Sequence, residues 1–163
     1  MADLLTPRLV GLAGYAGSGK DTAADVLEGL GYQRRAFAGA LKDLATRIGW
    51  DGRKDDAGRQ LLQELGVGCR EVLGADVWVQ ALMSTLTGPS VIVDVRFPNE
   101  VDAIADHGGI VLRIVRPSVG PCRNHVSETA LDDVDLPVVV NDGDVVDLHA
   151  RVLAVLAACP ATP

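Results

Sequence analysis

The chain of 163 residues has few cysteines, few lysines and few aromatic residues, and it has no long hydrophobic run. Its three cysteines (Cys69, Cys122 and Cys159) are far apart and form no CxxC pair, which argues against a disulfide framework or a zinc site. The apolar stretches are shorter than the roughly 18 residues of a membrane span. The N-terminus carries Asp3 and lacks the pattern of a secretory signal. These absences predict a soluble intracellular protein with reduced thiols.

The charge balance is acidic. Fifteen Lys and Arg residues stand against 22 Asp and Glu residues, a formal net charge of −7, which disfavours an electrostatic nucleic-acid binder. The only lysines are Lys20, Lys42 and Lys54, so arginine supplies the other twelve basic side chains. A GC-rich genome accounts for most of this excess, and individual arginines have to be argued by position. The length and the 48% apolar content predict one globular domain over residues 1–163.

Apolar runs alternate with segments of helical spacing along the chain. Strands are predicted at 9–13, 34–38, 90–95, 110–115 and 137–141. Helices are predicted at 21–30, 40–48, 58–73 with a break near Gly66 and Gly68, 76–86, 99–106 and 145–158, with a short helical turn at 127–131. Such alternation predicts a parallel sheet with helices on both faces, whose ligands bind at the carboxyl ends of the strands.

A glycine-rich loop follows the first predicted strand. Gly14-Tyr15-Ala16-Gly17-Ser18-Gly19-Lys20 fits the pattern GxxxxGK and leads directly into the first predicted helix. Glycines let successive backbone N–H groups converge on phosphate oxygens, the helix N-terminus adds its positive dipole end, and the lysine reaches the β- and γ-phosphates. The predicted nucleotide-binding residues are Gly14, Ala16, Gly17, Ser18, Gly19, Lys20, Asp21 and Thr22.

The residue after the lysine is Asp21, where such loops usually have a Ser or Thr that binds Mg²⁺. The sequence leaves two alternatives: the Asp21 carboxylate ligates the metal, which we favour, or Thr22 contributes its hydroxyl. Asp94 ends the apolar strand Val91-Ile92-Val93, where a Walker-B-type carboxylate would hold Mg²⁺ or its water. Asp21 and Asp94 are therefore the predicted metal ligands.

A phosphate loop occurs in kinases, GTPases, motors and switches, so the class has to come from other residues. A GTPase needs a guanine-reading Asn-Lys-x-Asp, and the segment Asn141-Asp142-Gly143-Asp144 lacks the lysine. Motor ATPases are larger. A small chain with arginines after its strands favours a small-molecule phosphotransferase, which needs positive groups around both donor and acceptor phosphates.

Four segments together resemble the phage-type deoxynucleoside monophosphate kinases. They are the loop continued through Asp21-Thr22-Ala23, Asp94-Val95-Arg96-Phe97-Pro98-Asn99-Glu100, Arg113-Ile114-Val115-Arg116-Pro117 and His125-Val126-Ser127-Glu128. Their order and spacing agree with that family from Gly11 to about Leu148. The resemblance implies a three-layer P-loop NTPase fold of the nucleoside monophosphate kinase type, with a five-stranded parallel sheet in the order 2-3-1-4-5. It also implies a helical monophosphate-binding region at about 38–88 and a lid-like segment at about 116–132.

The resemblance implies the reaction ATP + dNMP → ADP + dNDP with Mg²⁺, in which the protein aligns the phosphates and neutralises charge. We expect Lys20, Asp94, Arg70, Arg96 and Arg116 to be the catalytic residues, and Lys42, Arg70, Trp78 and Arg96 to bind the acceptor. For Trp78, packing in the core is the default alternative. Glu100 either pairs with Arg96 or caps a helix, and His125 is a candidate lid contact.

Two other functions share the loop. One is a kinase of another small phosphorylated metabolite, and the other is a non-catalytic ATP-binding switch, against which Lys42 and Arg70 argue mildly. The expected partners are the small-molecule substrates, without nucleic acid or membrane. The resemblance also suggests a homodimer, although the sequence has no heptad repeat. The expected location is the cytoplasm, that of the host if a phage encodes the chain.

Overall fold

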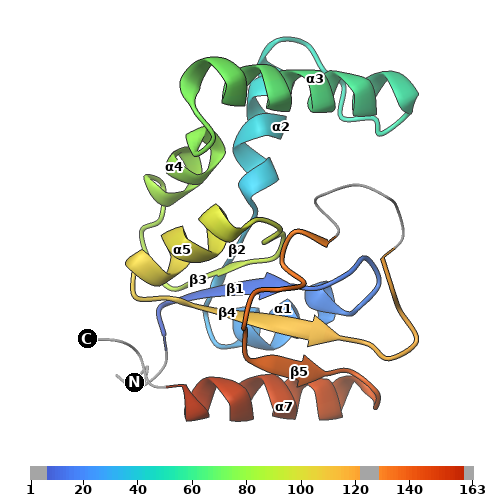
Figure 1. Cartoon of the computed structure of the whole chain (residues 1–163), viewed down its shortest axis with the longest axis vertical. Helices are drawn as coiled ribbons and strands as arrows, with labels where there is room; N and C mark the ends of the chain where they lie inside the picture. Colours follow the sequence, from blue (N-terminus) through green and yellow to red (C-terminus); the bar gives the residue numbers. More distant parts are fainter. Residues whose placement is uncertain (1–6, 122–128, 160–163) are drawn as a thin grey trace. The chain divides into compact units, whose positions relative to one another are not determined.

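The computed structural model describes residues 7–121 and 129–159. Their contacts divide the chain into two compact units. One unit contains the described residues up to Arg35 and from Thr87 onward, and the other is Ala36–Leu86. The first unit carries a sheet and the second is helical (Figure 1). In the part of the chain that the structure describes, no helix has the length and apolar character to cross a bilayer.

The first unit is built on a five-stranded sheet in the order β2-β3-β1-β4-β5, as predicted. Its strands are β1 (Leu9–Ala13), β2 (Gln33–Arg35), β3 (Ser90–Ile92), β4 (Ile110–Val115) and β5 (Val138–Val140). Every pairing is parallel. All carboxyl ends therefore meet at one edge, where the loop after β1 begins.

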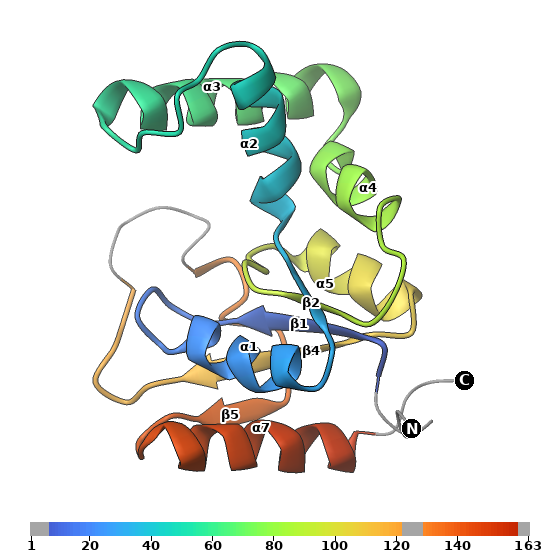
Figure 2. The same ribbon diagram turned by 180° about the vertical axis from the view of Figure 1, so that it is seen from behind.

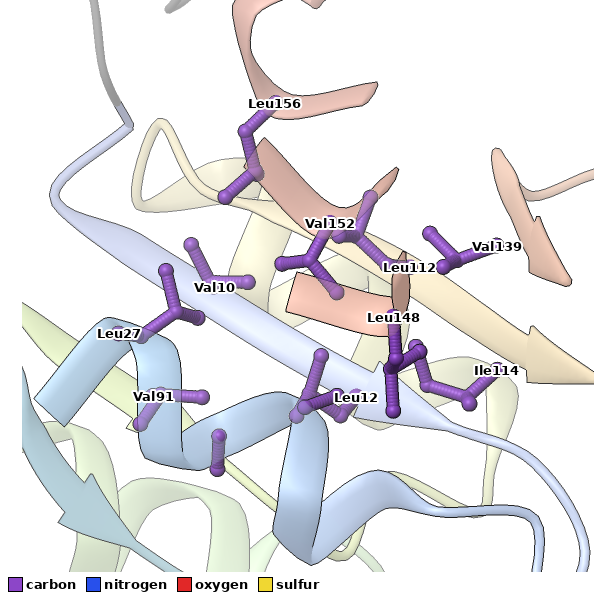
Figure 3. Packing of buried hydrophobic residues seen from close by; sticks show 12 residues of the cluster. Val10, Leu12, Leu27, Val91, Leu112, Ile114, Val139, Leu148, Val152 and Leu156 are labelled. Atoms are coloured by element: carbon purple, nitrogen blue, oxygen red, sulfur yellow. The ribbon is translucent and has the colours of Figure 1, made fainter. Parts of the chain in front are cut away.

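Helices cover both faces of this sheet. Alternate residues of β1 point to opposite sides, so each face has apolar side chains to bury. Val10 and Leu12 pack with α1 (Lys20–Gly29) and α7 (Val145–Ala158). Figure 3 shows Leu148, Val152 and Leu156 of α7 directed at the strands. Gly11 faces the other way, against Ile104 of α5 (Pro98–Asp106). Figure 2 shows the molecule from the opposite side, where α1 is in view.

The helical unit consists of α2 (Phe37–Arg47), α3 (Asp56–Leu73) and α4 (Val77–Met83). Asp55 caps α3 by accepting the N–H of Gly58 at 2.9 Å. The indole N–H of Trp78 donates to the carbonyl of Gly66 at 3.2 Å, which ties α4 to α3. Trp78 is buried, and so is Phe37 at the start of α2.

Several predicted bounds differ from the structure: β3 ends at Ile92 where the strand was expected to reach residue 95, and α4 ends at Met83 where the helix was expected to reach residue 86. Two further differences have a local cause. The second strand was expected at 34–38, but β2 ends at Arg35 and Phe37 begins α2, where its ring is buried. The predicted break in α3 is absent: the helix runs unbroken through Gly66 and Gly68. Gly66 lies against Leu41, so its missing side chain serves close helix packing and not a helix end.

The core gives the first testable prediction. Leu112 of β4 is fully buried in the cluster beneath α7. Leu112→Ala removes packed methyl groups and leaves a cavity, so we expect the free energy of unfolding to fall by roughly 2–5 kcal/mol in urea denaturation. The control is Leu30→Ala, because Leu30 is 59% exposed, and we expect a change of about 0.5 kcal/mol. Equal losses in the two variants would contradict this account of the core.

Candidate phosphate-binding site

The loop between β1 and α1 turns sharply at the carboxyl edge of the sheet. Residues 14–19 connect Ala13 to Lys20, the first residue of α1. The N–H of Ser18 donates to the Tyr15 carbonyl at 3.1 Å, and the N–H of Ala23 donates to the Gly19 carbonyl at 2.8 Å. The loop therefore runs into the N-terminus of a ten-residue helix, whose dipole favours an anion.

Lys20 folds back over this loop. Its Nζ donates to the carbonyls of Gly14 at 2.6 Å and Tyr15 at 2.9 Å. The ammonium group is half-buried and lies at the loop mouth.

Lys20 and the first three loop residues, Gly14, Tyr15 and Ala16, line a pocket of about 180 Å³ in the first unit. This is smaller than the roughly 300–1,000 Å³ of sites that enclose a drug-sized ligand, and it suits a phosphoryl group with its neighbours. Three cationic side chains and one carboxylate share its wall: Lys20, Arg96, Arg113 and Asp132. The structure thus brings the predicted residues Lys20 and Arg96 to one cavity. Positive charge converging on a phosphate loop suits a polyphosphate.

Arg113 and Asp132 line the pocket, although neither was among the predicted site residues. Hydrogen bonds hold both side chains in place. The Nη2 of Arg113 on β4 donates to the carbonyls of Leu131 at 2.5 Å and Val134 at 2.7 Å. The hydroxyl of Tyr15 lies 3.0 Å from both carboxylate oxygens of Asp132. Arg113 thereby fixes the segment that carries Asp132, and Asp132 holds the tip of the phosphate loop.

Asp94 and Arg96 follow β3. Asp94 lies at the carboxyl end of that strand, beside β1. The carboxylate of Glu100 is buried and accepts the backbone N–H groups of Arg96 at 2.6 Å and Phe97 at 3.1 Å. The sequence analysis left two roles for Glu100, pairing with Arg96 or capping a helix. These bonds to backbone N–H groups are typical of a carboxylate that caps the start of a helix. They fix the backbone from which the Arg96 side chain extends.

Asp21 takes part in an ion cluster with β2. Arg34 contacts Asp21 at 3.2 Å and both Asp25 and Glu28 at 2.6 Å. Burial alone would lower the pKa of Arg34, but its bonds to Glu28 and Asp25 outweigh burial and raise that pKa. The Asp21 carboxylate is therefore drawn towards Arg34, and Asp21 does not line the pocket.

Mg²⁺ prefers oxygen ligands, and in nucleotide sites it takes one or two carboxylates plus phosphate oxygens. Among the described residues no cluster of three or more His, Cys, Asp or Glu side chains could hold a metal by itself. Asp94 follows β3, and Asp21 and Thr22 lie in the first turn of α1; their oxygen atoms are of the type that Mg²⁺ prefers, but none of the three residues lines the pocket. The described residues thus offer Mg²⁺ suitable donor atoms but no preformed cluster of three protein ligands.

The other predicted site residues lie elsewhere. Arg116 follows β4, is exposed and does not line the pocket. Lys42 of α2 and Arg70 of α3 belong to the helical unit, as does the buried Trp78. His125 lies outside the described residues, and so does the middle of the predicted lid-like segment.

Asn141 contacts the loop and His149 contacts the first turn of α1, and neither residue was among the predicted site residues. Asn141, directly after β5, donates its Nδ2–H to the Ser18 carbonyl at 2.9 Å. The Nε2 of His149 on α7 lies 2.8 Å from the Thr22 carbonyl. Both bonds join residues more than a hundred positions apart, and no local pattern marks such pairs.

Comparison with known proteins found two viral relatives. No family model matches the chain. An uncharacterised protein of Ictalurid herpesvirus 1, ORF77, is 33% identical over 86% of this chain, and the match spans 66% of that relative, just under two thirds of its length. A protein of Acanthamoeba polyphaga mimivirus, named "Putative deoxynucleotide monophosphate kinase", is 28% identical over 90% of this chain and 94% of its own.

Several solved structures share the architecture. A Thermus thermophilus protein has a TM-score of 0.56 at 22% identity, covering 94% of this chain and 98% of its own. A Campylobacter jejuni dephospho-CoA kinase has a TM-score of 0.51 at 10% identity, covering 91% and 95%. A Janibacter sugar kinase has a TM-score of 0.50 at 18% identity, covering 95% and 97%. Together with the strand order and the GxxxxGK loop, these likenesses show that the chain has the P-loop kinase fold.

Proposed function

We propose that this chain is an ATP-dependent deoxynucleoside monophosphate kinase, which transfers the γ-phosphoryl group of Mg·ATP to a dNMP and releases ADP and dNDP. The observation that carries the proposal is the pocket in which the GxxxxGK loop, Lys20, Arg96 and Arg113 converge. The name of the mimivirus relative supports the choice of acceptor.

The phosphate loop binds the donor. Backbone amides of residues 17–22 and the dipole of α1 hold the β- and γ-phosphates. Lys20 exchanges its bonds to the Gly14 and Tyr15 carbonyls for bonds to phosphate oxygens. Its charge then neutralises the negative charge that builds up on the moving phosphoryl group.

The acceptor is already an ionised phosphate, so the reaction needs alignment and not a strong general base. Arg96 extends from a backbone fixed by Glu100, which suits a clamp between donor and acceptor phosphates. Mg²⁺ held by Asp94, with Asp21 or Thr22, would neutralise charge on the donor phosphates. Arg116, at the end of β4, is the further arginine that we assign to the donor phosphates.

The helical unit is proposed to bind the monophosphate. Lys42 and Arg70 are the basic residues that we assign to the acceptor phosphate. Trp78 donates to the Gly66 carbonyl one turn before Arg70, which steadies the helix that carries this arginine. A deoxynucleotide monophosphate offers a dianion to these groups, and a guanidinium can take it in a bidentate pair.

The test is ADP release from Mg·ATP with each of the four dNMPs, and with the corresponding ribonucleotides. We expect turnover with at least one dNMP, which also defines base and sugar preference. Acceptor-independent ATP binding without turnover on any nucleotide would contradict the proposal. Turnover on another phosphorylated metabolite would assign the chain to a different small-molecule kinase.

The bond between Tyr15 and Asp132 gives a second prediction. Tyr15→Phe removes the hydroxyl that lies 3.0 Å from each oxygen of Asp132 and leaves that carboxylate unpaired with the loop. A hydrogen bond to a charged group has a net value of roughly 1.5–3 kcal/mol, so we expect kcat/KM for ATP to fall about tenfold.

The matched control is Tyr32→Phe, because the Tyr32 hydroxyl donates to the Pro7 carbonyl at 2.7 Å, away from the loop. We expect this variant to keep the kcat/KM of the unmodified chain. Equal losses in the two variants would mean that the Tyr15 bond serves stability alone.

A further inference from the structure

Asn141 reaches the phosphate loop from the far end of the chain. It follows β5, and its backbone N–H donates to the Val115 carbonyl at 2.7 Å, which fixes its main chain beside β4. Its side-chain Nδ2 donates to the Ser18 carbonyl at 2.9 Å. The backbone bond does not depend on the side chain, so the contact with the loop can be removed without unpairing this end of the sheet.

The bond to Ser18 determines the direction of one peptide unit. The Ser18–Gly19 peptide is trans, and in a trans peptide the C=O and N–H point to opposite sides. Because the carbonyl is directed at Asn141, the Gly19 N–H is directed away from it. This amide stands at the N-terminus of α1, where a phosphate loop offers its N–H groups to an anion.

The hydrogen bond between Asn141 and Ser18 also requires a glycine at position 19. A Cβ at this position would clash with the Asn141 Nδ2, and φ is +103°, in the left-handed region. The absence of a side chain at Gly19 thus allows Asn141 to reach the Ser18 carbonyl. The second glycine of the GxxxxGK pattern and the asparagine after β5 form one structural unit.

We propose that Asn141 is a positioning residue that holds the Ser18–Gly19 peptide with its N–H aimed at the donor phosphates. This inference rests on the proposed function, because it assigns the donor site to the loop. Without the side chain, the peptide can rotate and turn its carbonyl to the anion. An amide donor would then be replaced by an acceptor, which repels phosphate.

The test measures binding of Mg·ATP and of inorganic tripolyphosphate by calorimetry. The variants are Asn141→Ala, which removes the donor, and Asn141→Asp, which places a carboxylate against the Ser18 carbonyl. We expect about tenfold weaker binding of both probes in Asn141→Ala and a larger loss in Asn141→Asp. Binding of dNMP alone should stay unchanged, a result that a general loss of structure would not give.

The control variant is Asp142→Asn, the next residue, which contacts Arg151 at 2.6 Å on the surface. It should bind both probes as the unmodified chain does. Urea denaturation confirms that each variant is folded. In the unmodified chain, the amide resonance of Gly19 should shift when tripolyphosphate binds, and this readout does not depend on any variant.

Three results would overturn the inference. Folded Asn141 variants that bind tripolyphosphate normally would show that the side chain does not position the loop. A Gly19 amide resonance that ignores tripolyphosphate would show that this N–H is not a donor. An unmodified chain that binds neither ATP nor tripolyphosphate would overturn the proposed function as well, which separates the two failures.

Discussion

Replacing Lys20 with alanine is expected to lower kcat/KM for phosphoryl transfer by at least about 10²–10³-fold, the range seen when one preorganised donor to a transition-state charge is removed. The ammonium group is the cation nearest the loop carbonyls, at 2.6 Å from the Gly14 oxygen. Its removal leaves the loop amides in place, so the effect falls mainly on the chemical step. Steady-state ADP release with the preferred dNMP measures it.

The control for this substitution is Lys54→Ala. Lys54 is exposed in the connection between α2 and α3, outside the loop. The two variants lose the same charge, so a difference between them isolates the position of the charge from the net charge of the chain. Turnover that survives in Lys20→Ala would remove the loop from the mechanism.

Gly14→Ala is expected to destabilise the fold and the loop together. The φ angle of Gly14 is +136°, and a Cβ there would meet the backbone oxygen of Ile114 and lie 2.8 Å from the Ser18 hydroxyl. A backbone carbonyl of the adjacent strand cannot move aside as a flexible side chain can. We expect a loss of roughly 3 kcal/mol or more in the free energy of unfolding, from strain and steric overlap combined.

Gly31→Ala separates strain from overlap. Gly31 also has a positive φ, of +93°, but a Cβ there has no heavy atom within 4 Å. Only the conformational cost remains, about 1–2 kcal/mol. Urea denaturation of both variants provides the comparison. If Gly14→Ala lowers the free energy of unfolding no more than Gly31→Ala does, the close approach of β4 to the loop does not contribute to the cost of the substitution.

The elements that could be predicted from the sequence are those whose own residues determine them. The apolar runs at 9–13 and 110–115 and the helical spacing at 145–158 give β1, β4 and α7 with the predicted bounds. The predicted end of the second strand was wrong because Phe37 is equally suited to a strand and to the buried start of a helix. The break at Gly66 failed because glycine weakens a helix but also permits close packing.

The candidate site divides in the same way. The GxxxxGK loop is local, so its position between β1 and α1 was predictable. The network of Arg113 with the Leu131 and Val134 carbonyls was not, because those acceptors are backbone atoms that any residue would provide. The Asn141 contact depends on the register of β4 and β5, which brings Asn141 beside the loop. A long-range hydrogen bond to a main-chain atom cannot be predicted from the sequence, because every residue type carries the same backbone acceptor.

The strand order has a consequence for the timing of folding. β1 is made early, yet its neighbours are β3 and β4: Leu9 pairs with Ser90, and Val10 pairs with Ile110. During synthesis, the central strand has no partner until the ribosome has passed β3, and its second edge stays unpaired until β4 follows. The apolar residues of β1 therefore stay in contact with water or chaperones during this time. The entropy of closing long loops has to be lost before the burial of the core contributes any stabilising free energy. We expect refolding to be limited by this step, with the phosphate loop acquiring its shape only once the last strand has docked.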